Sequence, residues 1–143
     1  MTIPILLLDT NVVVSGLRSS AGASHRLLQL VDQGLFELGL TAPLVLEYEA
    51  TCKRLIGAIR LTVQELDQVI DYLCQIGKPC VVHFRVRPSV SDPDDDMVLE
   101  AAVAAGGGWI VTHNVRDLAG GAKRYGVEVL TPAEALRRLG VVR

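Results

Sequence analysis

The chain has 143 residues, of which 50% are hydrophobic and 4% are aromatic, so it predicts one domain whose core is built mainly from Leu, Val, Ile and Ala. No apolar run approaches the roughly 20 residues that span a bilayer, and no leader segment precedes the first strand-like stretch, so we expect a cytoplasmic protein that crosses no membrane. The net charge of −2 argues against nucleic-acid binding by bulk positive charge.

The expected elements alternate between strands and helices along the chain. The apolar run from Ile3 to Leu8 is too short for a helix and predicts a strand buried on both faces. Thr62 and Glu65 form a capping box, and Thr131 followed by Pro132 predicts the start of the last helix. The expected strands cover residues 3–8, 36–40, 80–84, 109–112 and 127–130, and the expected helices cover 23–34, 43–56, 62–77, 92–105 and 131–139. This order predicts one α/β domain over residues 1–143, a central parallel sheet of about five strands with helices on both faces.

Polar residues follow the predicted strands. In open α/β sheets, binding sites lie just beyond the carboxyl ends of the strands, so these side chains should gather at one edge. The candidates for catalysis, in chain order, are Asp9, Glu47, Asp95, Asp96, Asn114 and Asp117. Asp9 has a structural alternative, since it could cap the turn after the first strand. Asp117 also has one, because it could cap the segment that follows it.

Helical phase separates neighbouring acids. Position 95 lines up with an apolar stripe at 98, 99 and 102, whereas position 96 lines up with a mixed face, so we favour Asp95 and keep Asp96 as the second candidate. Glu47 shares a face with apolar residues and should lean inward. Glu49 has Lys53 four residues on, which is the favourable order for an exposed ion pair.

Three converging carboxylates need a cation. If Asp9, Glu47 and Asp95 meet, each pair about 4 Å apart costs roughly 4 kcal/mol at an effective dielectric near 20. Ligands that are all oxygen favour a hard ion, Mg²⁺ or Mn²⁺, over zinc. The three cysteines include no CxxC pair and no His at ligand spacing, so we expect buried thiols rather than disulfides or a zinc site. The cation would bind a phosphodiester and activate a water for attack on phosphorus.

With these residues placed, the sequence resembles the PIN-domain family, and within it the toxin-type (VapC-like) ribonucleases of toxin–antitoxin pairs. The segments that carry the resemblance are LLLDTNVVVSGL at 6–17, APLVLEYEA at 42–50, SDPDDDMVLEAAVAAG at 91–106 and IVTHNVRDL at 110–118.

The resemblance implies an endoribonuclease that cuts single-stranded RNA with Mg²⁺ or Mn²⁺. If an ion-activated water attacks phosphorus and the ribose 3′-oxygen leaves, we expect 5′-phosphate and 3′-hydroxyl ends. The resemblance also implies a small antitoxin protein as partner and a homodimer. Asp9, Glu47 and Asp95 match the family's three acids, and Thr10 and Asn11 match the polar residues that orient the first. The frequent fourth acid is Asn114 here, a variant familiar among toxin-type members. Thr112 and Arg116, beside it in the same segment, are expected to orient substrate.

Other interpretations stay open. A haloacid dehalogenase-type phosphatase wants a second Asp two residues after Asp9, where this chain has Asn11, and a phospho-receiver domain wants a Lys after the fifth strand, where it has Thr131. A degenerate PIN domain that binds RNA or protein without cutting, or a stand-alone RNA-processing nuclease, is the remaining alternative. Arginines such as Arg18 and Arg54 are expected to be solvated surface, and Arg116 is the strongest exception.

Overall fold

The structure, a computed structural model, describes residues 2–82 and 93–141, except for the side chains of residues 93–96. Its strands are β1 (Ile5–Leu8), β2 (Glu37–Leu40), β3 (Lys78–Pro79), β4 (Trp109–Val111) and β5 (Glu128–Leu130). Its helices are α1 (Thr10–Arg18), α2 (Ala23–Gln29), α3 (Ala42–Arg54), α4 (Val63–Ile76), α5 (Pro93–Ala104), α6 (Val115–Arg124) and α7 (Pro132–Arg138), with a 3₁₀ turn at Ile56–Ala58. Among the described residues, no helix is long and apolar enough to cross a membrane.

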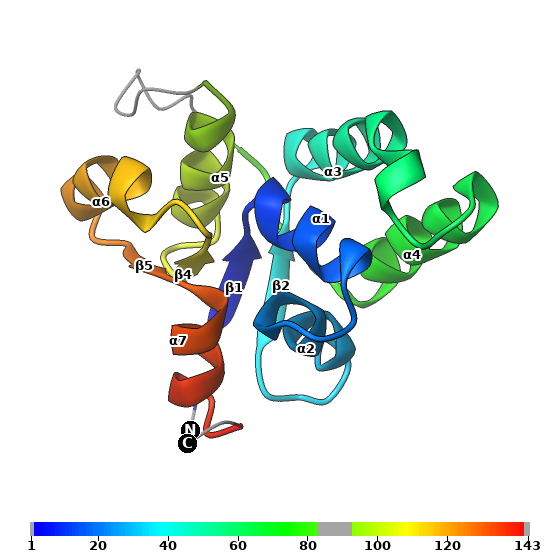
Figure 1. Ribbon diagram of the computed structural model, residues 1–143. Coiled ribbons are helices and arrows are strands. Elements are labelled where there is room, and N and C mark those ends of the chain that lie inside the picture. The colour runs from blue at the N-terminus through cyan, green and yellow to red at the C-terminus, as the bar shows by residue number, and fades with distance from the viewer. Residues whose placement is uncertain (1, 83–92, 142–143) are drawn as a thin grey trace.

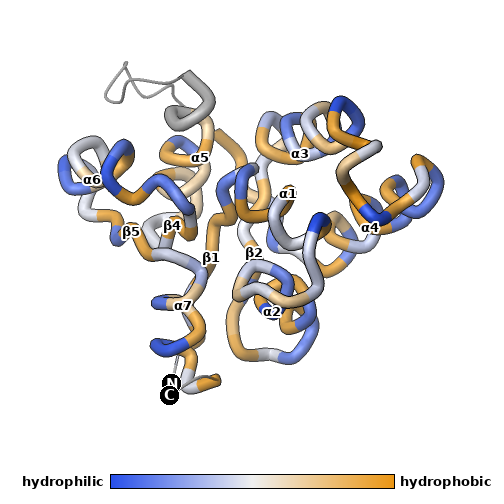
Figure 2. The backbone as a smooth tube through the Cα atoms, viewed as in Figure 1, coloured by the Kyte–Doolittle hydropathy of each residue, from blue (hydrophilic) through white to orange (hydrophobic). Residues whose placement is uncertain are grey.

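The five strands form one parallel sheet in the order β3-β2-β1-β4-β5 (Figure 1). β1 is the central strand, and Figure 2 shows it as hydrophobic along its length. Leu6, Leu7 and Leu8 are fully buried, which confirms the prediction of a strand covered on both faces. In the sheet, β1 pairs with β2 along one edge and with β4, which comes later in the chain, along its other edge. The carboxyl ends of β1 and β4 therefore mark the point where the strand order reverses, and ligands bind at such points in open α/β sheets.

Helices cover both faces of this sheet, as predicted. Right-handed crossovers place the helices that follow β1 and β2 on one face and those that follow β3 and β4 on the other. The packing of α1 against α2 and α3, of α3 against α4, and of α5 against α6 agrees with that arrangement. The consequence for function is that α1 and α3, which follow neighbouring strands, lie side by side at the edge where the acids were expected.

Two helices form where the sequence pattern predicted none. α1 contains Val12, Val13 and Val14, and β-branched residues lower helix propensity. The helix forms because Asp9 caps it and because all three valines are buried in the core. α6 contains Gly120 and Gly121, which also weaken a helix. In both cases burial of one helix face outweighs a poor local propensity.

Two predicted boundaries are wrong. The third strand was placed at residues 80–84, but β3 is Lys78–Pro79, and Val81 is 66% exposed; residues 83 and 84 lie outside the described part of the chain. Pairing with β2 decides this position, and Pro79 is tolerated because β3 lies at the sheet edge. α2 was predicted to reach Gly34 but ends at Gln29, and the apolar Leu30 and Val31 are buried in the turns that follow.

The predicted caps are correct. Thr62 and Glu65 make both hydrogen bonds of a capping box at the start of α4, and Thr131 and Glu134 do the same for α7. The backbone N–H and the hydroxyl of Thr131 hold the pKa of Glu134 below its ordinary value. Of the three free cysteines, Cys52 is buried as expected, whereas Cys74 is exposed, so the expectation of buried thiols is only partly met.

Candidate active site

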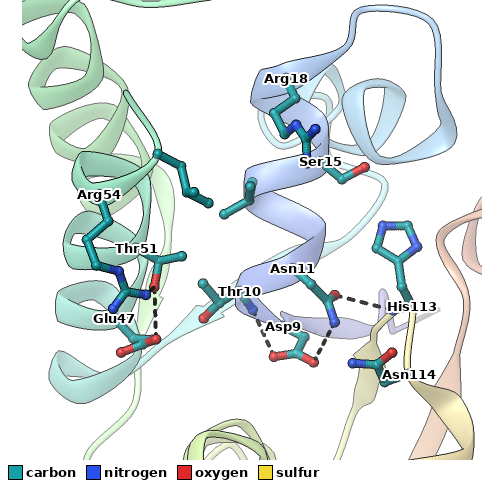
Figure 3. A pocket seen from close by; sticks show the side chains of 12 residues that line it. Asp9, Thr10, Asn11, Ser15, Arg18, Glu47, Thr51, Arg54, His113 and Asn114 are labelled. Atoms are coloured by element: carbon teal, nitrogen blue, oxygen red, sulfur yellow. Dashed lines mark hydrogen bonds between the residues drawn. The ribbon is translucent and has the colours of Figure 1, made fainter. Parts of the chain in front are cut away.

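A cavity of about 450 Å³ opens at the carboxyl end of the sheet, between α1, α3 and the residues that follow β4 (Figure 3). Two predicted acids, Asp9 and Glu47, line it from different elements. Among the described residues, the lining consists of Asp9, Thr10, Asn11, Val14, Ser15, Arg18, Glu47, Thr51, Arg54, Leu55, His113 and Asn114. Five of the residues predicted from sequence, Asp9, Thr10, Asn11, Glu47 and Asn114, therefore share one cavity.

Asp9 lies at the junction of β1 and α1 and is only 6% exposed. Its Oδ1 accepts a hydrogen bond of 2.9 Å from the backbone N–H of Thr10, so it caps α1, and the structural alternative for this residue is correct. Its Oδ2 accepts bonds from the Thr112 hydroxyl at 2.7 Å and from the Asn11 amide at 3.3 Å. Capping and function are compatible here, because these bonds fix the orientation of a carboxylate that faces the cavity.

Thr112 is the residue through which β4 reaches Asp9. It is fully buried, and its Oγ1 donates to Asp9 Oδ2 while accepting the backbone N–H of Asn114 at 3.0 Å and a longer bond of 3.4 Å from the Asn11 amide. The backbone N–H of Asp9 also donates to the carbonyl of Val111 at 2.9 Å. One hydroxyl therefore ties together the ends of the two central strands.

His113 connects the site to two further elements. Its backbone N–H donates to Asn11 Oδ1 at 3.3 Å, and its ring Nε2 lies 3.1 Å from the hydroxyl of the buried Ser24 in α2. The imidazole is therefore held against α2 at the mouth of the site. Ser24 carried no signal in the sequence, because only the tertiary packing brings α2 to the end of β4.

Glu47 is held by its neighbours on α3. Its Oε1 accepts a 2.9 Å bond from the hydroxyl of Thr51, and Thr51 Oγ1 in turn accepts a 3.1 Å bond from the guanidinium of Arg54. Glu49 lies 3.9 Å from Lys53 in a surface ion pair, as predicted. The predicted difference between these two acids is confirmed: Glu47 lines the cavity and Glu49 does not.

Tyr48 anchors α3 to the end of β1. Its hydroxyl donates to the carbonyl of Leu8, and its side chain is 1% exposed. Burial, and after it the negative charge of Asp9, hold the pKa of Tyr48 well above the ordinary value for tyrosine. This contact joins the residue before Asp9 to the residue after Glu47, so it fixes the relative position of the two acids.

The side chains of Asp95 and Asp96 lie outside the described residues. Their backbone belongs to the first turns of α5, and Val98, Leu99 and Ala102, the stripe predicted to align with position 95, are fully buried. Among the side chains that the structure describes, which do not include these two aspartates, no three metal-binding groups lie together. The third acid thus stays a prediction.

The residues after β4 divide into two groups. Asn114 lines the cavity at the start of α6, whereas Asp117 and Arg116 are exposed in the first turn of α6 and are absent from the described lining. Arg18 and Arg54, which were expected to be ordinary surface, do line it. The sequence signal that could have found them is their helical spacing from the polar residues of α1 and α3.

Fold and site together define an α/β domain with buried and half-buried acids at the carboxyl edge of a parallel sheet. The family model described as PIN domain matches residues 5–116. The chain therefore belongs to the PIN-domain family, a family of nucleases, as the resemblance in its sequence predicted.

One similar solved structure is the crystal structure of VapBC2 from Rickettsia felis bound to a DNA fragment from their promoter. The match has a TM-score of 0.57 and 12% sequence identity, and it covers 88% of this chain and 96% of that one. At this identity the likeness establishes a shared fold. No curated protein matches the chain.

Proposed function

We propose that this protein is an endoribonuclease that hydrolyses single-stranded RNA with the help of Mg²⁺ or Mn²⁺. The observation that carries the proposal is that Asp9 and Glu47, which belong to different elements, line one cavity at the switch point of a PIN-domain sheet. The products would be 5′-phosphate and 3′-hydroxyl ends.

The donor set fits a hard divalent cation. The polar atoms of Asp9, Glu47 and Asn114 that reach the cavity are oxygens and an amide, and the described lining contains no thiol. Asp9, Glu47 and, from helical phase, Asp95 would hold the ion, with Asp96 as the alternative third ligand. When bound, the ion would supply a Lewis acid for the phosphate and a nucleophilic hydroxide at neutral pH.

The remaining residues of the site would orient these acids and the substrate. Thr112, Asn11 and the N–H of Thr10 fix the Asp9 carboxylate, because each donates a hydrogen bond to it. Thr51 fixes Glu47 in the same way. Outer partners of this kind commonly change metal affinity by about 10–100-fold when they are lost. Asn114 would contribute a neutral amide near the acids, and Asp117 and Arg116 would act from the rim.

We also propose that the protein is the toxin of a toxin–antitoxin pair in the cytoplasm, held inactive by a small antitoxin, and that it forms a homodimer. The shared fold with a protein of the VapBC2 structure and membership of the PIN-domain family support this setting. A gene for a short DNA-binding protein directly beside this one would support the pair, and its absence would favour a stand-alone RNA-processing nuclease.

The test compares RNA cleavage by variants of the two cavity acids with cleavage by a variant of Glu49, a surface acid on the same helix as Glu47. Single-stranded RNA is incubated with the wild-type protein and Mn²⁺, and with the variants Asp9→Asn, Glu47→Gln and Glu49→Gln. We expect cleavage by wild type and by Glu49→Gln, and none by the other two or after addition of EDTA. Full cleavage by Asp9→Asn, or cleavage that persists in EDTA, would refute the assignment. RNA binding without any cleavage by wild type would favour a non-catalytic binding domain.

A further inference from the structure

The cavity is lined by two rows of side chains that change from acidic to basic along their helices. On α1 the row runs from Asp9 through Asn11 and Ser15 to Arg18. Asp9 caps the helix, and Asn11, Ser15 and Arg18 follow at intervals of four and three residues, so these three lie on one face of it. Figure 3 shows Asp9 at one end of α1 and Arg18 at the other.

The second row lies on α3 and has the same order. Glu47, Thr51 and Arg54 are spaced by four and three residues, and all three line the cavity. Thr51 hydrogen-bonds to both of the others, so the guanidinium of Arg54 lies close to the Glu47 end (Figure 3). Arg18 is further away: nine residues at about 1.5 Å of rise per residue place it roughly 13 Å along α1 from Asp9.

A structural role explains these arginines only in part. Arg18 and Arg54 are the last residues of their helices, where a positive charge favours the helix dipole. Arg26, in the last turn of α2, has that same role but does not line the cavity in the described part of the chain. The dipole therefore accounts for a basic residue at each helix end, but not for two of them facing the same acidic cavity.

Neither arginine is paired with an acid of the described residues. The ion pairs found there involve Lys53, Lys78 and Arg138. Arg18 and Arg54 are both exposed, and Arg54 makes its hydrogen bond to a neutral hydroxyl. Their charges are therefore available to an anion that enters the cavity.

We propose that Arg54 and Arg18 form a phosphate track that guides an RNA strand along α1, away from the acidic end of the cavity. This inference rests on the proposed ribonuclease function. Arg54 binds the phosphate next to the one that is cut, and Arg18 binds a phosphate further along the strand. With about 3.4 Å per stacked nucleotide, roughly 13 Å corresponds to about four nucleotides. The track supplies locally the positive charge that the net charge of −2 does not provide.

The experiment measures how salt weakens RNA binding. In the Asp9→Asn background, which prevents cleavage, a labelled single-stranded RNA of about 12 nucleotides is titrated by fluorescence anisotropy between about 50 and 200 mM NaCl. The plot of log K against log salt concentration has a negative slope. Each lost phosphate contact should reduce the magnitude of this slope by about 0.7 for a single strand. We expect that decrease for Arg18→Ala and for Arg54→Ala, about 1.4 for the double variant, and no change for the matched Arg26→Ala.

Substrate length gives a second measurement. Removing Arg54 should weaken binding of a dinucleotide as well as of the long RNA, whereas removing Arg18 should affect only the long RNA. If RNA binds but the slopes of both arginine variants equal that of Arg26→Ala, the track is wrong and the ribonuclease proposal stands. If the wild-type protein cleaves no RNA in parallel reactions, the proposed function fails and the track fails with it.

Discussion

Replacing Thr112 by valine removes a buried hydroxyl and keeps the shape of the side chain. The Oδ2 atom of Asp9 then loses a hydrogen bond of 2.7 Å, and the backbone N–H of Asn114 loses its acceptor. A hydrogen bond to a charged group contributes about 1.5–3 kcal/mol, and a neutral one about 0.5–1.5 kcal/mol. The 3.4 Å contact with Asn11 is long enough to contribute little. Thr112→Val should therefore lower the free energy of unfolding by about 2–4.5 kcal/mol.

The assay is urea unfolding in EDTA, with two variants for comparison. Thr112→Ser keeps the hydroxyl and should cost less than about 1 kcal/mol, the value of one buried methyl group. Thr41→Val is the matched control, because Thr41 is also buried and its hydroxyl accepts the N–H of Leu44, as a helix cap. Loss of such a cap costs about 1 kcal/mol. If Thr112→Val costs no more than Thr41→Val, the hydroxyl does not hold Asp9 as the geometry indicates.

Three further predictions concern the site and the core. Thr51→Val should weaken Mn²⁺ binding about 10–100-fold by releasing Glu47, and Thr51→Ser should restore it; equal affinities measured by calorimetry would exclude this role. For the two candidate aspartates of α5, Asp95→Asn should abolish Mn²⁺ binding while Asp96→Asn keeps it, and the reverse result would show that the helical phase was assigned wrongly. Burial raises the pKa of Cys52 from 9.0 to about 11, so its contribution to stability is complete below pH 9 and is lost as the pH rises to 11. Wild type should therefore lose up to about 2–3 kcal/mol more than Cys52→Ala over that range, and parallel stability curves would contradict the assignment.

The amino-acid sequence was sufficient to predict helix faces and helix caps, which depend on residues a few positions apart. The period of apolar residues separated Glu47 from Glu49, and the structure agrees, with Glu47 in the cavity and Glu49 paired to Lys53. Cap residues marked the starts of α4 and α7 correctly. These signals are readable because capping bonds and helix faces involve residues within about four positions of each other.

Contacts between distant segments decided the rest. The existence of α1, against the low helix propensity of its valines, depends on the core that buries them. The position of β3 depends on the backbone of β2 and not on the apolar residues 80–82. Ser24 meets His113 across 89 positions, and Thr112 meets Asp9 across 103. Such contacts follow from the order of strands in the sheet, which the spacing of residues along a chain does not encode. The sequence therefore identified Asp9 and Glu47 as candidates, while only the tertiary structure showed that Thr112 holds Asp9 and that arginines from two helices share the cavity.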